Sequence, residues 1–138
     1  MERRRPRILL IDDNEATLQT LSFALRPHFS VWIARNAGHA IEVAKELEWD
    51  ADAIVTDLNL GAGLRGDQFA AYYRERQKSE TPVVLMTGAS EIVDLHPHAR
   101  IAVVRLKPVD LEGLIQALWS LIRRDRQGWE SDSRPPSR

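Results

Sequence analysis

The chain has 138 residues, 43% of them hydrophobic, no cysteine, and a formal net charge of −1 at pH 7. This length suits one domain with a single core, and a chain without cysteine forms neither disulfides nor a thiolate metal site. No stretch approaches the roughly 18 apolar residues of a membrane span, and the apolar run after the N-terminal arginines is too short for a signal peptide. We therefore expect a cytoplasmic protein with no membrane partner.

Basic residues gather at the two ends of the chain and not along a helix face. Residues 1–6 read MERRRP, and residues 123–138 read RRDRQGWESDSRPPSR. We expect residues 1–6 to be a basic N-terminal extension and the polar, proline-containing residues 125–138 to be a disordered tail. Solvated ends of this kind predict no direct binding of nucleic acid, with a phosphate-contacting N-terminal arm as the alternative.

Short runs of branched aliphatic residues alternate with stretches of helical periodicity. The runs ILLI, VWIA, DAIVT, PVVLM and IAVVRL predict strands at residues 8–11, 31–34, 52–56, 82–86 and 101–106. Nearly continuous apolar strands are typical of a parallel sheet covered by helices on both faces. We therefore expect an open, doubly wound α/β fold, whose ligands bind beyond the carboxyl ends of the strands.

Four helices are predicted from apolar residues spaced three and four positions apart. Their apolar faces are Leu18, Leu21 and Leu25; Ala37, Ala40, Ile41 and Ala44; Phe69, Tyr72 and Tyr73; and Leu111, Leu114, Ile115, Leu118 and Ile122. Pro27 ends the first helix at about Arg26, and Asp110 is placed to cap the last one. Pro97 limits any helix within residues 89–100 to about two turns.

Polar side chains follow the carboxyl ends of four of the expected strands. They are Asp12 and Asp13, Asp57, Thr87, and Lys107. Because the carboxyl ends of parallel strands meet at one edge of the sheet, we expect these side chains to face one crevice. The adjacent carboxylates repel each other and favour a bound cation, whereas a simple helix cap at Asp13 or Asn14 is the alternative for that pair taken alone.

Three carboxylates form an oxygen site of the kind that Mg²⁺ occupies, and Mn²⁺ is a second candidate. A cation held by Asp12 and Asp13 would allow Asp57 to stay ionised and to attack phosphorus, giving an aspartyl phosphate. Lys107 would neutralise phosphoryl oxygens, and the Thr87 hydroxyl would donate a hydrogen bond to one of them. The sequence therefore predicts phosphoryl transfer to Asp57, with Thr87 and Lys107 as the other catalytic residues.

With these motifs the chain resembles the receiver domains of response regulators over about residues 7–124. IDDNE matches the acidic pair, VTDLNL the phosphoacceptor, LMTG the switch hydroxyl, and RLKP the lysine–proline pair. The resemblance implies a flavodoxin-like, five-stranded parallel sheet with strand order 2-1-3-4-5. It also implies that Asn59 lends its backbone carbonyl to the metal beside Asp12, Asp13 and Asp57, and that the bond between Lys107 and Pro108 is cis.

The resemblance implies a phosphorylation switch of two-component signalling. A sensor histidine kinase or a histidine phosphotransfer protein would supply the phosphoryl group, and a downstream protein would read it. The chain would catalyse its own phosphorylation and dephosphorylation without being a turnover enzyme, as a monomer or weak homodimer. The motifs LMTGASE and VVRLKP, together with the short fourth helix, are most similar to receivers of hybrid histidine kinases and their stand-alone relatives.

The sequence departs from the family pattern at three positions. Val104 stands three residues before Lys107, where many receivers have an aromatic residue that reports phosphorylation, so we expect no aromatic switch. Gly61 stands where many members have proline, in a loop that is one residue longer than usual. Val109 replaces a frequent phenylalanine, which we interpret as a packing variation.

Other interpretations stay open. One alternative is a fragment of a hybrid kinase or of a DNA-binding regulator, and another is a receiver-like scaffold that is never phosphorylated. GAGLRG, residues 61–66, fits a dinucleotide fingerprint but lacks the acidic residue expected about 20 positions later. An aspartate-nucleophile phosphatase would use similar groups in a different order. The four histidines, His28, His39, His96 and His98, are expected at the surface, and Trp119 is a partner-binding candidate if it points outward.

Overall fold

A five-stranded parallel sheet forms the centre of the protein, in a computed structural model that describes residues 4–88 and 94–133. The strands are β1 (Arg7–Ile11), β2 (Ser30–Ala34), β3 (Ala53–Asp57), β4 (Val83–Thr87) and β5 (Val103–Leu106). All neighbouring strands run in the same direction, in the order β2-β1-β3-β4-β5. This arrangement confirms the predicted fold.

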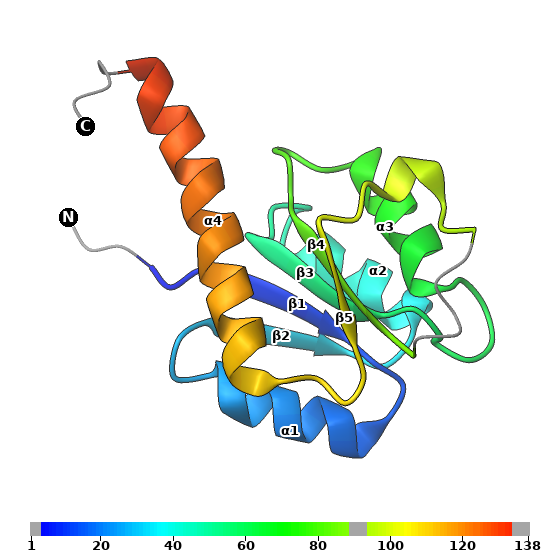
Figure 1. Cartoon of the computed structure of the whole chain (residues 1–138). Coiled ribbons are helices and arrows are strands. Elements are labelled where there is room, and N and C mark those ends of the chain that lie inside the picture. Colours follow the sequence, from blue (N-terminus) through cyan, green and yellow to red (C-terminus); the bar gives the residue numbers. More distant parts are fainter. Residues whose placement is uncertain (1–3, 89–93, 134–138) are drawn as a thin grey trace.

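Helices cover both faces of the sheet (Figure 1). They are α1 (Glu15–Leu25), α2 (Ala37–Glu46), α3 (Gly66–Arg74) and α4 (Leu111–Ser133), with a single 3₁₀ turn, η2 (Pro97–Ala99). One core cluster joins α1 and α4 to the sheet, and a second joins α2 and α3 to its opposite face. The three central strands, β1, β3 and β4, are therefore dry on both sides, which leaves the edge strands and the strand ends to meet water.

The central strand β1 shows why the strands read as continuous apolar runs. Its side chains alternate between the two faces, so that Leu9 and Ile11 enter the α2–α3 cluster while Ile8 and Leu10 enter the α1–α4 cluster. All four are fully buried. A strand buried on both faces favours apolar side chains, and β1 has none that is polar between Arg7 at its start and Asp12 after its end.

Asparagine side chains fix the starts of the first two helices. The Asn14 side chain accepts a hydrogen bond from the backbone N–H of Thr17, and the Asn36 side chain does the same for His39. Asn14, one of the two capping candidates, is therefore the α1 cap, and the Asp13 side chain does not cap the helix. The helix ends at Leu25, with Arg26 as its C-cap, as Pro27 predicts.

Arg74 of α3 attaches this helix to the segment before β4 and to the connection from β4 to β5. The guanidinium of Arg74 donates hydrogen bonds to the backbone carbonyls of Thr81, Ala99 and Arg100. Its side chain is 5% exposed. In the described part of this connection, from Asp94 onward, the only helical element is η2, which begins at Pro97. The rest of the predicted short helix falls on residues 89–93, outside the described residues.

The last helix differs in length from the prediction. Leu114, Leu118 and Ile122 of α4 are buried against the sheet, as their spacing predicts. The helix then continues to Ser133, where the sequence predicts a disordered tail from residue 125. The boundary of the globular domain near residue 124 stays a prediction. Among the residues that the structure describes, no helix has the length and apolar character needed to cross a membrane.

We predict that Arg74→Ala lowers the free energy of unfolding by about 3 kcal/mol, because three backbone carbonyls lose a charged donor in a mostly buried place. Chemical denaturation followed by circular dichroism measures this loss. The matched control is Arg76→Ala, two residues further on at an exposed position, for which we expect a loss below about 1 kcal/mol. Equal losses in the two variants would contradict the anchoring role of Arg74.

Candidate functional site

The predicted site residues meet at one edge of the sheet. Asp57 and Thr87 are the last residues of β3 and β4, Asp12 and Asp13 follow β1, and Lys107 follows β5. The parallel strand direction brings these ends together, as the sequence predicts. The peptide bond between Lys107 and Pro108 is cis, which also agrees with the prediction.

The three aspartates form a compact group of carboxylates. Each offers an oxygen atom, and these atoms all lie within 4.8 Å of one another. Asp12 and Asp57 are buried, whereas Asp13 is exposed. Like charges this close are unfavourable unless cations offset them. A group of hard oxygen donors, open to water on one side, fits a divalent cation such as Mg²⁺.

Lys107 supplies one positive charge to this group. Its Nζ lies 2.9 Å from Oδ2 of Asp57 and 3.3 Å from Oδ2 of Asp12, so a single ammonium bridges two carboxylates. Partial burial by itself would lower the pKa of Lys107, but the hydrogen bond and charge of Asp57, with those of Asp12, raise it above its ordinary value. Lys107 is therefore a cation at neutral pH.

The Asp57 carboxylate is held in balance by opposing effects. Burial raises its pKa, the Lys107 hydrogen bond lowers it, and the Asp12 charge raises it again, and the result lies above the ordinary value for aspartate. One ammonium therefore does not fully offset the burial and crowding of the carboxylates. A divalent cation at the same edge would favour the ionised form of Asp57.

Asn59 lies beside Asp57 in the loop that follows β3. Its backbone N–H lies 3.4 Å from Oδ1 of Asp57, and its side-chain oxygen accepts a hydrogen bond from the N–H of Gly61 at 3.2 Å. The side chain is therefore used to shape the loop. This placement leaves a backbone carbonyl as the group by which Asn59 would serve a metal, the role that the family resemblance implies.

The glycines of the GAGLRG stretch have structural roles in this loop. Gly61 and Gly63 have positive φ angles of 78° and 96°, which glycine adopts most readily. Gly66 lies against β3, and a Cβ atom there would stand 2.1 Å from the backbone oxygen of Asp57. The third glycine therefore sets how closely α3 approaches β3, and the stretch is accounted for without a dinucleotide.

Thr87 is the last residue of β4, the strand beside β3. Its side chain is buried, and its hydroxyl donates a hydrogen bond to the backbone carbonyl of Gly88 at 3.2 Å. Thr87 is paired in register with Leu106, the residue before Lys107. The hydroxyl and the ammonium thus come from the ends of adjacent strands.

An ion pair that the sequence analysis did not identify lies next to this site, between the fully buried Asp67 and the partly exposed Arg65. Arg65 donates to both carboxylate oxygens of Asp67, at 3.0 and 2.8 Å, and the backbone N–H of His96 donates to Asp67 at 2.7 Å. Arg65 also reaches the backbone carbonyl of Asp94. The pair therefore joins the loop after β3 to the connection after β4. An arginine and an aspartate flanking Gly66 are the sequence signal, but the fully buried position of Asp67 is not readable from it.

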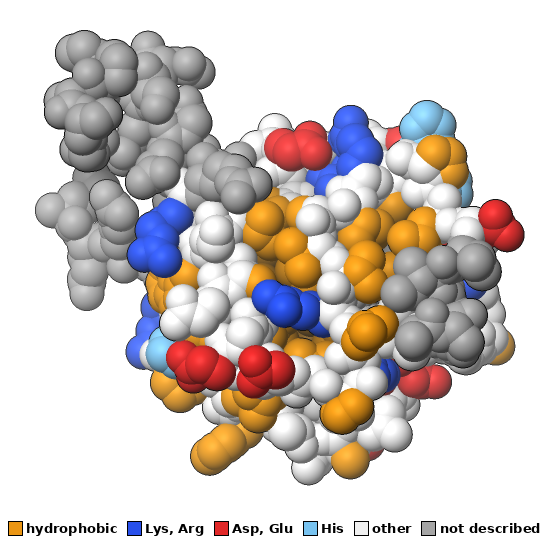
Figure 2. Space-filling view, viewed as in Figure 1, with side chains coloured by type: hydrophobic (Ala, Val, Ile, Leu, Met, Phe, Trp, Pro, Cys, Tyr) orange, Lys and Arg blue, Asp and Glu red, His pale blue; other side chains and the backbone are white. Residues whose placement is uncertain are grey.

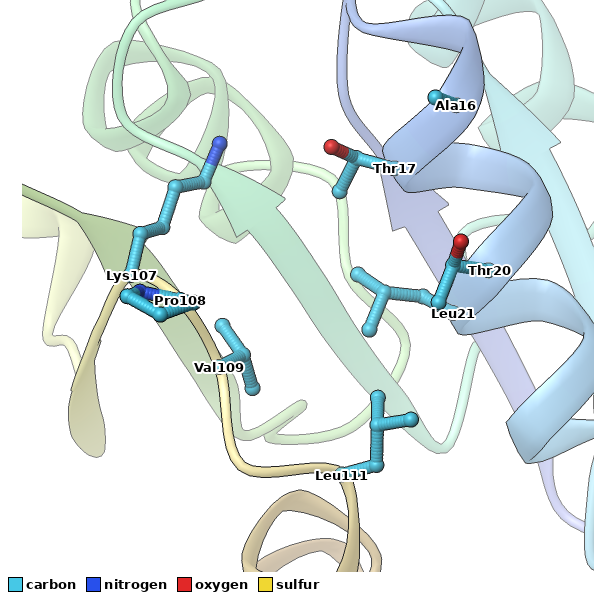
Figure 3. Close-up of a pocket in the computed structure, with 8 residues that line it drawn as sticks. All are labelled: Ala16, Thr17, Thr20, Leu21, Lys107, Pro108, Val109 and Leu111. Carbon is cyan, nitrogen blue, oxygen red and sulfur yellow. The ribbon is translucent and has the colours of Figure 1, made fainter.

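A cleft of about 560 Å³ opens beside Lys107, between α1 and the loop that leads into α4 (Figure 3). Thr17, Thr20 and Leu21 line it from α1. Lys107, Pro108 and Val109 line it from the opposite side. The cleft gives the ammonium side of the acidic group a route to solvent that is bordered by small polar and apolar side chains.

The other residues named in the sequence analysis lie outside the acidic group. Val104 is 36% exposed on β5, at the position where many receivers have an aromatic residue. On the face seen in Figure 2, apolar groups lie at the surface among charged ones. The Trp119 ring is half-buried, 4.9 Å from the ring centre of Phe29. The Nδ1 atoms of His39 and His96 accept backbone hydrogen bonds. Among the described residues, the acidic group is the one cluster of three or more potential metal ligands.

A family model described as "Response regulator receiver domain" matches residues 8–118. A search of curated proteins gave no match. The signal receiver domain of an HD domain-containing protein from Pseudomonas fluorescens Pf-5 is similar with a TM-score of 0.81 and 27% identity, over 94% of this chain and 96% of that one.

Two further solved structures are similar. The N-terminal domain of a response regulator/sensory box/GGDEF 3-domain protein from Carboxydothermus hydrogenoformans has a TM-score of 0.75 and 25% identity, over 88% of this chain and 98% of that one. The chemotaxis response regulator CheY4 of Vibrio cholerae has a TM-score of 0.74 and 22% identity, over 85% and 98%. The likeness to the latter is a likeness of fold.

We predict that Gly66→Ala displaces the end of β3, because the new Cβ would overlap the backbone oxygen of Asp57. We expect a loss of about 2 kcal/mol in the free energy of unfolding and weaker binding of Mg²⁺. Chemical denaturation and isothermal titration calorimetry measure the two effects. The control is Gly38→Ala within α2, where a Cβ meets nothing closer than 3.4 Å and alanine favours the helix. Wild-type behaviour of Gly66→Ala would contradict the close approach.

We predict a pH-dependent contribution from Asp67 to stability. Burial by itself would raise its pKa, but the Arg65 ion pair and the His96 hydrogen bond outweigh burial and bring it below the ordinary value. A lowered pKa means that the ionised carboxylate stabilises the fold at pH values above about 4 and that this stabilisation is lost as the pH falls further.

The test compares wild type with Asp67→Asn by chemical denaturation at pH 7 and at acidic pH. At pH 7 we expect the variant to be less stable by about 3 kcal/mol, and we expect the difference to shrink below about pH 4. Glu46→Gln, an exposed change on α2, should stay within about 0.5 kcal/mol of wild type. A difference for Asp67→Asn that grows toward low pH would have the wrong sign.

Proposed function

Because the chain belongs to the response regulator receiver domain family, we propose that it is a phosphorylation switch of two-component signalling whose phosphoacceptor is Asp57. The observation that carries the proposal is the bridge from Lys107 to both Asp57 and Asp12 inside a group of three carboxylates. A receiver implies a histidine kinase or phosphotransfer protein as partner in general. Here we propose a phosphohistidine of such a protein as the donor.

Asp57 is the nucleophile in the proposed reaction. One of its carboxylate oxygens forms a bond to phosphorus while the bond between phosphorus and the imidazole nitrogen of the donor breaks, and the electron pair of that bond stays on the nitrogen. Lys107 remains an ammonium, and its hydrogen bond can pass from the Asp57 carboxylate to a phosphoryl oxygen without a proton transfer. Its raised pKa supports this constant charge.

Mg²⁺ is the proposed cofactor, and Mn²⁺ would suit the same oxygen donors. Asp12, Asp13, Asp57 and the backbone carbonyl of Asn59 would hold it. Once bound, the ion supplies positive charge that offsets the phosphoryl oxygens and the carboxylates. The backbone N–H of Asn14 holds one oxygen of Asp12 in place at 2.9 Å, which orients this ligand before any ion binds.

Thr87 is proposed to report the phosphorylated state. Its hydroxyl would turn from the Gly88 carbonyl to a phosphoryl oxygen and so shift the loop after β4 between two arrangements. Because Val104 stands in place of an aromatic residue, we propose that the connection after β4 presents the conformational change to the downstream partner. The Arg65–Asp67 pair binds this connection through hydrogen bonds with the backbone of Asp94 and His96, and Arg65 lies at the end of the loop that carries Asn59.

The setting of the switch has a second candidate. Two of the similar structures are domains of larger proteins, namely an HD domain-containing protein and a three-domain GGDEF protein. This supports the alternative that the chain is a receiver cut from a hybrid kinase or from a regulator with an output domain. The chemistry at Asp57 is the same in both settings.

We predict that the chain acquires one phosphoryl group from acetyl phosphate when Mg²⁺ is present. Intact-mass spectrometry of the whole chain measures the adduct, and Asp57→Asn should abolish it because the nucleophile is gone. Omission of Mg²⁺ should lower the yield by at least about tenfold. A turnover phosphatase would instead release phosphate continuously, and the absence of an adduct with any donor would favour the scaffold alternative.

A second variant, measured in the same assay, tests the ammonium group of Lys107 while it leaves the Asp57 nucleophile in place. Lys107→Ala keeps Asp57 but removes the ammonium 2.9 Å from its carboxylate, so we expect phosphorylation to slow by about a hundredfold while the fold is kept. The exposed Lys45→Ala change on α2 is the matched control and should leave the rate unchanged. An unaltered rate in Lys107→Ala would remove Lys107 from the proposed mechanism.

A further inference from the structure

The outer side of α1 carries an exposed aromatic side chain. Phe23 is 78% exposed, the highest value among the exposed large hydrophobic side chains of the described residues. A groove of about 310 Å³ lies beside it and is bordered by Leu18 of the same helix and Ile33 of β2. An exposed aromatic ring next to an apolar groove is typical of a surface that binds another protein.

Four residues that border this groove form a row along α1, which we call the α1 stripe: Glu15, Gln19, Phe23 and Arg26. Spacings of four, four and three residues place them on one side of the helix. The stripe is acidic at its first end, apolar at Phe23, and basic at its last end. Arg5, which donates a hydrogen bond to the Arg26 carbonyl, adds positive charge at the basic end.

We propose that the α1 stripe is the interface of a homodimer in which α1 packs antiparallel against α1 of a second copy. A two-fold axis across the stripe places Glu15 of each copy opposite Arg26 of the other. The same axis places Phe23 of each copy against the Leu18 and Ile33 groove of the other. A parallel pair would set like charges face to face, so charge selects the antiparallel orientation.

The charged ends of the stripe are accessible for this pairing. Glu15 is bound by Arg35 at 2.8 Å, yet both side chains are about half exposed, so the carboxylate has room for a second cation. Within residues 4–88 and 94–123, for which side chains are described, no carboxylate is paired with Arg26. The stripe therefore has an unused positive charge at one end and an open carboxylate at the other.

No element of the described chain covers this side of α1, which lies at the lower rim of the molecule in Figure 1, where apolar side chains protrude in Figure 2. The Lys107 cleft uses the other side of the helix, with Thr17 and Thr20. The dimer thus leaves the acidic site open, and the proposal stands independently of phosphorylation. An interface built on 11 residues of helix is small, so we expect a Kd on the order of 100 μM.

Sedimentation velocity of the full chain, from about one-tenth to about ten times this Kd, tests the proposal. Wild type should pass from monomer to dimer with rising concentration, and Phe23→Ser should raise the Kd by at least about thirtyfold because both copies lose the ring. The matched control is Leu106→Ser, which removes a 51% exposed apolar side chain on β5 and should leave the Kd unchanged.

A charge exchange tests whether opposite charges at the ends of the stripe hold the dimer together. Arg26→Glu makes the stripe acidic at both ends, and Glu15→Arg makes it basic at both ends, so each variant alone should be monomeric. Mixed together they should associate about as tightly as wild type, because each acidic end then meets a basic end. Thermal unfolding of each variant confirms that it is folded before mixing.

Three outcomes overturn the proposal. The first is a wild-type chain that stays monomeric at the highest concentration. The second is a dimer that is weakened by Leu106→Ser and not by Phe23→Ser, since the interface would then lie on β5. The third is a failure of the two charge variants to associate when mixed, although each is folded and monomeric. Phosphorylation by acetyl phosphate is assayed separately, so its failure would leave the dimer result unaffected.

Discussion

The common direction of the five strands is the constraint on which the rest of the molecule depends. A parallel sheet covered on both faces is dry, so its backbone polar groups are satisfied within the sheet and its side chains are apolar. Polar chemistry is then confined to the strand ends, and all carboxyl ends lie on one edge. This is why Asp12, Asp57 and Lys107, separated by up to 95 positions in the sequence, share hydrogen bonds. Their proximity follows from topology before any specific contact is considered.

The crowding that results is partly offset within the chain. Lys107 bridges two of the three carboxylates, and the N–H of Asn14 holds one oxygen of Asp12. The raised pKa of Asp57 shows that this is incomplete. Excess negative charge at the site favours the binding of a divalent cation. The bound cation then offsets the negative charge that an incoming phosphoryl group brings.

The sequence was sufficient to predict the strands, the apolar faces of the helices and the residues of the acidic edge, because hydrophobic periodicity and strand ends are local signals. Asp67 was missed since its full burial depends on Arg65 folding back over it and on His96, 29 positions away. The length of α4 beyond Ile122 also escaped prediction, because no apolar face is needed where the helix leaves the sheet. Phe23 has an ordinary helical position in the sequence, and only the three-dimensional structure identifies it as exposed.

Helix α1 and the acidic edge share one residue, and this has a mechanical consequence. The side chain of Asn14 fixes the first turn of α1, while its backbone N–H holds Asp12. A displacement or rotation of α1 would therefore move Asn14, and with it the N–H group that is hydrogen-bonded to the Asp12 carboxylate. A force on any part of this 11-residue helix would be transmitted to the acidic group through the backbone N–H of Asn14. The position of α1 and the position of the Asp12 carboxylate are therefore coupled.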